Sequence, residues 1–256
     1  MDKLIPGIFN YCDRWCERCE YRDRCRLFQS ETERNIQHIL NDEDPDDPEI
    51  VAQDISESLQ DALEMLKEQM EIEGITEEDI EDCEDEDSQF FIDDFDDERE
   101  EVSESGRIIK SPHPLASQAD NLFKDVIYYF NKIKIAFPDA ISEIEPVNNP
   151  LYEEIKILLW YSPQIAVKTR MCVGSKTKLE NSRTDYDEFE VEMMNVNSRI
   201  AFTGMEKCLK SLQKVYQLEA NYSDDVLSLL STIKKMKDEF EKEFPSVHTF
   251  KRPYFD

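Results

Sequence analysis

The chain has 256 residues, 39% of them apolar and 10% aromatic, so it is long and apolar enough to bury a core. Its 5 glycines are too few for the turns of a parallel α/β fold or for a glycine-rich phosphate loop. The formal net charge is −29, and residues 41–105 alone carry 30 acidic and 2 basic side chains. The acidity therefore belongs to one segment, which repels phosphates and argues against nucleic-acid binding.

The N-terminal sequence MDKLIPGIFNYCDRW lacks the basic and then apolar stretches of a signal peptide. The longest apolar run, IKILLWYSPQIAV, is too short and too interrupted to span a bilayer. We therefore expect a cytoplasmic protein without a membrane partner. Because disulfides are disfavoured in the cytosol, clustered cysteines there indicate metal binding or redox chemistry.

Four of the 7 cysteines follow one another near the N-terminus with the spacing C-x3-C-x2-C-x5-C. Four thiolates are the ligand set of tetrahedral zinc or of a [4Fe–4S] cluster. On a helix, Cys12, Cys16 and Cys19 would share one face, and Cys25 would return through a bend to complete the site. The five interleaved arginines would offset the thiolate charge or lower the pKa of the thiols. We predict that residues 1–40 are a helical metal-binding segment with these four cysteines as ligands.

The helices that follow are predicted from their ends and their periodicity. An S-x-x-E capping box at Ser30 predicts that a helix starts or restarts there, and the polar stretch NDEDPDDPE follows as a break. Pro48 suits the first position of a second helix. Apolar residues recur at helical spacing from Ile50 onward, so we predict an acidic amphipathic helix within residues 41–74.

Residues 75–106 are acidic and of low complexity, which predicts a linker, because a run of like charges opposes compaction. An alternative is that this segment recognises a partner. Phe90, Phe91 and Phe95 lie among the acidic residues, and such alternation is typical of segments that dock in a basic-rimmed groove. On that reading the protein is an adaptor for a basic protein partner.

Residues 107–256 have the pattern of a four-helix bundle with a C-terminal strap, FPSVHTFKRPYFD. Pro163 is predicted to kink or split the second helix, and residues 173–185 are predicted to be a connection. The third helix is predicted over about 185–219, where small residues would let another helix approach closely. No segment has the alternating pattern of a strand, so the fold class is predicted to be all-α, an antiparallel helical bundle. The small residues of the third helix are Ser198, Ala201 and Gly204.

Catalytic arrangements find little support. Glu154 and Lys156 form the E-x-K pattern of some nucleases, but they lie in a helical run instead of a strand and such a match is expected by chance. A di-iron bundle needs Glu three residues before His, and the residues three positions before His38, His113 and His248 are Asn, Lys and Pro. We therefore expect a structural metal more than a catalytic one.

The core CERCEYRDRC resembles the clustered cysteines of iron–sulfur RecB-type nucleases and of accessory domains in radical-SAM enzymes. That resemblance favours [4Fe–4S] over zinc. The cysteine-rich head, the helical stretch NVNSRIAFTGMEKCLKSL and the Phe-Pro…Arg-Pro…Phe-Asp tail together resemble a family of uncharacterised bacterial helical proteins. The family implies a helical fold and no mechanism. The expected function is a metal-binding protein, with an adaptor role or iron–sulfur electron transfer as alternatives.

Overall fold

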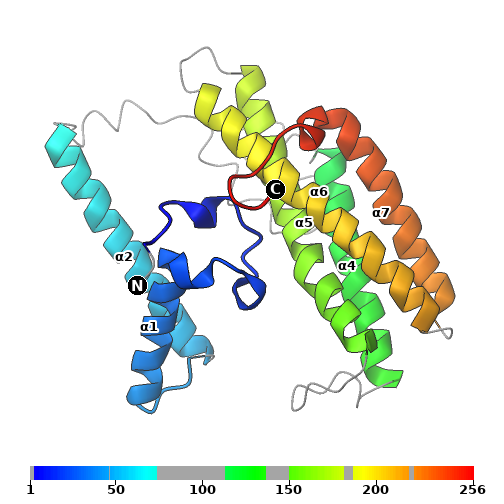
Figure 1. Ribbon diagram of the computed structural model, residues 1–256, viewed down its shortest axis with the longest axis horizontal. Helices are drawn as coiled ribbons and strands as arrows, with labels where there is room; N and C mark the ends of the chain where they lie inside the picture. Colours follow the sequence, from blue (N-terminus) through cyan, green and yellow to red (C-terminus); the bar gives the residue numbers. More distant parts are fainter. Residues whose placement is uncertain (1–2, 46, 74–112, 137–149, 182–186, 219–221) are drawn as a thin grey trace, which may run out of the picture. The chain divides into compact units, whose positions relative to one another are not determined.

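The computed structural model describes residues 3–45, 47–73, 113–136, 150–181, 187–218 and 222–256 (Figure 1). Every regular element in these ranges is a helix, which confirms the predicted all-α class. The chain divides into two compact units: Met1–Arg26 with Ser111–Asp256, and Leu27–Lys110. No helix in the described ranges combines the length and the apolar composition of a membrane span.

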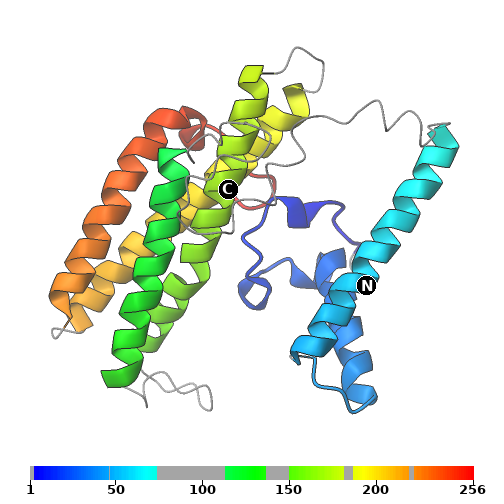
Figure 2. The same cartoon turned by 180° about the vertical axis from the view of Figure 1, so that it is seen from behind.

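The larger unit contains four long helices that contact one another around a ring, α4 with α5, α5 with α6, α6 with α7 and α7 with α4. The colours in Figures 1 and 2 reverse direction from each helix to the next, so successive helices are antiparallel. This arrangement confirms the predicted bundle. The helices are α4 (Pro114–Ala136), α5 (Pro150–Asn181), α6 (Asp187–Leu218) and α7 (Ser223–Glu243).

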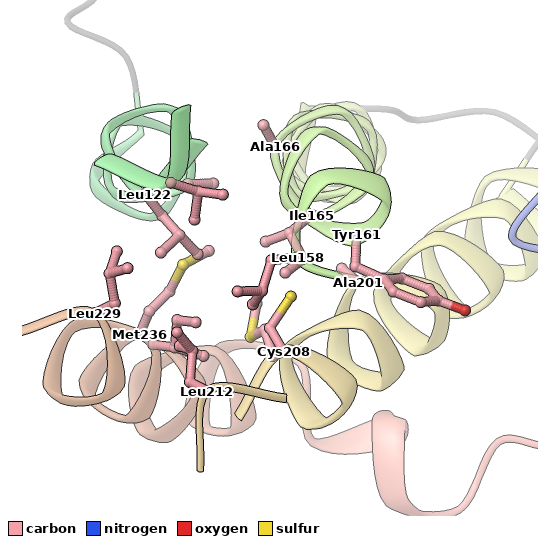
Figure 3. Packing of buried hydrophobic residues seen from close by; sticks show 14 of the residues in the cluster. Leu122, Leu158, Tyr161, Ile165, Ala166, Ala201, Cys208, Leu212, Leu229 and Met236 are labelled. Carbon is pink, nitrogen blue, oxygen red and sulfur yellow. The ribbon is translucent and has the colours of Figure 1, made fainter. Parts of the chain in front are cut away.

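The core of the bundle is made by apolar side chains that recur at helical spacing on each of the four helices. Figure 3 shows residues from all four helices directed into this shared interior. Burial of these side chains is the main source of stability, at about 25 cal/mol per Å² of apolar surface. Fully or almost fully buried examples are Leu122 on α4, Leu158 and Ile165 on α5, Cys208 and Leu212 on α6, and Met236 on α7.

Helix α5 is longer than its sequence pattern indicates. It runs without interruption through Pro163 to Asn181, so the prediction of a connection beginning at residue 173 is wrong. The extra turns are held by packing: Val173 is buried, and the ammonium of Lys176 pairs with the carboxylate of Glu243 on α7. These contacts outweigh the low helix propensity of Gly174.

Helices α5 and α6 approach closely, as the small residues of α6 predict. Ser198 and Ala201 are completely buried. A Cβ placed on Gly204 would lie 3.1 Å from Cγ1 of Ile165 and 3.3 Å from Cδ1 of Tyr161. Only a glycine therefore fits at this position without displacing a neighbour.

The smaller unit contains α1 (Arg26–Leu40) and α2 (Pro48–Glu73). Helix α2 begins at Pro48, as predicted, whereas α1 begins before Ser30, so the capping-box prediction is wrong. The two helices are tied by His38, whose Nδ1 lies 2.7 Å from Oε2 of Glu43 and whose Nε2 lies 3.1 Å from Oδ1 of Asp54.

Candidate metal centre

The N-terminal segment is not the helix that the cysteine spacing suggests. It consists of three short 3₁₀ turns, η1 (Ile8–Asn10), η2 (Cys16–Arg18) and η3 (Arg22–Arg24). Arg14 has a left-handed backbone with φ of 59°, which interrupts any helix between the first and second cysteines. The prediction that three thiols share one helical face is therefore wrong.

The structure places the four thiols in different local settings. Turn η2 joins two of them, because the amide of Cys19 donates to the carbonyl of Cys16 at 3.1 Å. The thiol of Cys12 lies 3.5 Å from the carbonyl oxygen of Phe9. Cys25 is buried, the other three are half-buried, and none of the four is in a disulfide. Within the described ranges, no three His, Cys, Asp or Glu side chains gather into a group that could hold a metal ion.

The electrostatics of Cys12 oppose ionisation of its thiol. Burial raises the pKa of Cys12, and the charges of Asp13 and Cys19 raise it further, while Arg14 lowers it through its backbone amide and its charge. The balance is a raised pKa, so the expectation that the arginines activate the thiols does not hold for Cys12. A bound cation would reverse this balance, because it stabilises the thiolate directly.

Most of the neighbouring arginines face other groups. The guanidinium of Arg18 pairs with Glu153 at 2.6 Å and lies 3.9 Å from the ring centre of Trp15. Arg22 lies 3.6 Å from the carboxylate of Asp23, and the Nε of Arg24 donates to the carbonyl of Lys3. These side chains position the segment more than they compensate thiolate charge.

An aromatic contact holds the segment on the bundle. Trp15 is 9% exposed and stacks on Trp160 of α5, with ring centres 5.2 Å apart. The indole Nε1 of Trp160 donates to the carbonyl of Asp13 at 3.1 Å. A stacked pair of indoles contributes about 1 kcal/mol beyond the area it buries.

A polar network continues from this contact to α6. The hydroxyl of Tyr161 donates to the carboxylate of Asp13, and the ammonium of Lys207 donates to the same hydroxyl. Burial alone would raise the pKa of Asp13, but the hydrogen bond from Tyr161 and the charge of Lys207 hold it below its usual value. Burial and the neighbouring carboxylate raise the pKa of Tyr161 well above its ordinary range, so its hydroxyl stays protonated.

Beside this network lies a cavity of about 670 Å³, bounded by the N-terminal segment, α5, α6 and the C-terminal residues. Its lysines, Lys207, Lys210 and Lys214, share one face of α6 at a spacing that the sequence pattern could have disclosed. Their partners could not be read from the sequence. Glu154 of α5 is buried and accepts hydrogen bonds from Ser211 at 2.6 Å and Lys214 at 2.7 Å. The lining carries five basic and three acidic side chains, and Lys207 pairs with Asp13 as Lys214 pairs with Glu154.

The C-terminal residues complete the attachment of the segment. The guanidinium of Arg252 is buried, forms a two-point ion pair with Asp256 and also reaches the carbonyl of Tyr11 at 3.4 Å. The hydroxyl of Tyr21 donates to the carbonyl of Tyr254 at 3.1 Å. The strap and the cysteine segment therefore stabilise each other.

Two further cysteines belong to the core of the bundle. Cys172 and Cys208 are completely buried in the bundle core, and burial raises the pKa of Cys208 to about 12. Phe90, Phe91 and Phe95 lie outside the described residues. Comparisons with protein-family models, curated proteins and solved structures find no match for this chain.

Proposed function

We propose that this protein binds a metal centre, a [4Fe–4S] cluster or a zinc ion, through Cys12, Cys16, Cys19 and Cys25. The observation that carries the proposal is the concentration of four thiols, none in a disulfide, in a segment of 3₁₀ turns where η2 joins Cys16 to Cys19. Four thiolates satisfy either metal, and short turns rearrange around a metal more readily than a regular helix does.

On this proposal the role of the metal is structural. Few residues of the N-terminal segment are buried, namely Ile5, Ile8, Trp15 and Cys25. A segment with so little apolar surface and no long helix gains much of its order from a metal that links its turns. The metal would then fix the surface that Trp15 presents to α5, and with it the network from Asp13 to Lys207.

The identity of the bound metal decides between a structural role and electron transfer. A zinc ion has no redox chemistry and leaves only the structural role. A [4Fe–4S] cluster adds the capacity for one-electron transfer, and three of the four thiols are half-buried, near enough to the surface for a redox partner to approach.

The test is to purify the full chain under reducing, anaerobic conditions and to measure its metal content and absorption spectrum. We expect either about one zinc per chain without colour, or about four iron per chain with broad absorption near about 400 nm. The double variant Cys16→Ser/Cys19→Ser should lose the metal. The matched control Cys83→Ser, which removes a cysteine outside the cluster, should keep it. Protein without metal under these conditions would refute the proposal.

A further inference from the structure

Four large apolar residues of helix α2 are exposed to solvent. They recur every four residues and therefore follow one side of the helix. Among the described residues 48–60, only Ile50 and Asp54 are half-buried, and the rest are exposed. We call the exposed apolar residues of α2 the α2 stripe; they are Val51 (41% exposed), Ile55 (56%), Leu59 (60%) and Leu63 (56%).

A helix with such a face needs a partner. Helix α2 has 26 residues, and isolated helices are marginally stable in water unless an apolar face is packed. The contacts with α1 are near its N-terminal end, where Asp54 meets His38 at 3.1 Å and Arg34 at 3.9 Å. Helix α1 also exposes large aliphatic side chains; these are Ile36, Ile39 and Leu40.

The charge around the α2 stripe selects the kind of partner. Residues 41–66 contain 10 acidic residues and no lysine or arginine. A second copy of α2 would bring acidic residues against acidic residues, which disfavours self-association. Anionic lipid surfaces and nucleic acids are repelled for the same reason. A helix with an apolar face and basic flanks matches both the apolar surface and the charge.

We propose that the α2 stripe is a docking surface for a basic amphipathic helix of another protein. The partner's aliphatic side chains would cover Ile55 and Leu59, and its lysines or arginines would face Glu57 and the other acidic residues of α2. This surface lies in the smaller unit, so its occupation does not depend on a metal at the cysteines.

The test uses the full chain and a fluorescently labelled amphipathic peptide of leucine and lysine, followed by anisotropy. The double variant Ile55→Gln/Leu59→Gln removes the apolar surface but keeps the charge, and glutamine preserves helix propensity. We expect this variant to raise the Kd at least about tenfold. The matched control Leu227→Gln, at an exposed leucine of α7, should leave the Kd unchanged.

Two further measurements separate docking from general attraction between opposite charges. A scrambled peptide of the same composition should bind more weakly than the amphipathic peptide. Glu57→Lys should weaken binding at low salt, with a smaller difference at high salt, because ions screen surface charges. Equal affinity of the wild type and the glutamine double variant would overturn the proposal. So would a wild-type dimer in sedimentation equilibrium that the double variant loses, because the occupant would then be a second copy.

Discussion

The close approach of α5 and α6 at Gly204 can be tested by adding a single methyl group. In Gly204→Ala the new Cβ would lie 3.1 Å from Ile165 and 3.3 Å from Tyr161, closer than ordinary van der Waals contact. The ring of Tyr161 has little freedom to move away, because its hydroxyl is bonded to Asp13 and Lys207. The substitution should therefore strain the contact between these helices and disturb the adjacent network.

The size of the effect follows from two opposing contributions. Replacing glycine by alanine inside a helix stabilises it by about 1 kcal/mol. Forcing a methyl group into a filled interface costs about 1–3 kcal/mol. We expect Gly204→Ala to lower the free energy of unfolding by about 1 kcal/mol, which corresponds to a fall in Tm of about 2–4 °C for a unit of this size.

Helix α5 offers a matched control in Gly174. A Cβ at this position has no neighbour within 4 Å among the described residues, so only the gain in helix propensity remains. Gly174→Ala should therefore raise the free energy of unfolding by about 0.5–1 kcal/mol. The two substitutions are chemically identical and are expected to change stability in opposite directions.

The unfolding of both variants in urea can be followed by tryptophan fluorescence. The chain has 2 tryptophans, Trp15 and Trp160, and both belong to the larger unit, so the signal reports that unit alone. If Gly204→Ala stabilises the protein as much as Gly174→Ala does, α5 and α6 do not pack as closely as the structure shows.

Three other predictions concern titratable groups. The hydrogen bonds of His38 with Glu43 and Asp54 raise the pKa of its imidazole. These hydrogen bonds therefore stabilise the smaller unit fully below about pH 6.5, and their contribution is lost as the pH rises through the raised pKa. An NMR titration of His38 with a midpoint at or below about 6.5 would contradict this. Burial would raise the pKa of Asp256, but hydrogen bonds from Arg252 and then Arg199 hold it well below its usual value. The interactions of the Asp256 carboxylate therefore stabilise the protein above about pH 4, and this stabilisation is lost as the pH falls through the lowered pKa. Asp256→Asn should cost about 2 kcal/mol in urea unfolding, whereas Asp238→Asn at an exposed site should change stability by less than about 0.5 kcal/mol. In native metal-free protein at pH 8, Cys208 should resist alkylation for hours while Cys19 reacts, because burial raises the pKa of Cys208 to about 12. Equal labelling of the two cysteines in mass spectrometry would disprove this.

The long helices could be predicted from the sequence because periodic apolar residues and the residues at helix ends are local signals. Helix α6 was expected over about 185–219 and runs over Asp187–Leu218, and Pro48 begins α2 as its position indicates. The small residues around Gly204 also indicated the close helix contact. In each case the relevant physical preference, helical spacing or side-chain size, depends on residues that are close together in the sequence.

The parts that only the tertiary structure decided depend on residues far apart in the chain. Residues 173–181 read as a connection, but contacts with α7 keep them helical. The cysteine spacing fits a helix, yet the left-handed backbone at Arg14 and the stacking of Trp15 on Trp160 impose separate turns. The sequence by itself determined that four thiols lie close along the chain and that long amphipathic helices form. The fold decided that Asp13 meets Lys207 and that the α2 stripe is exposed, because burial and long-range contacts are not encoded in any local pattern.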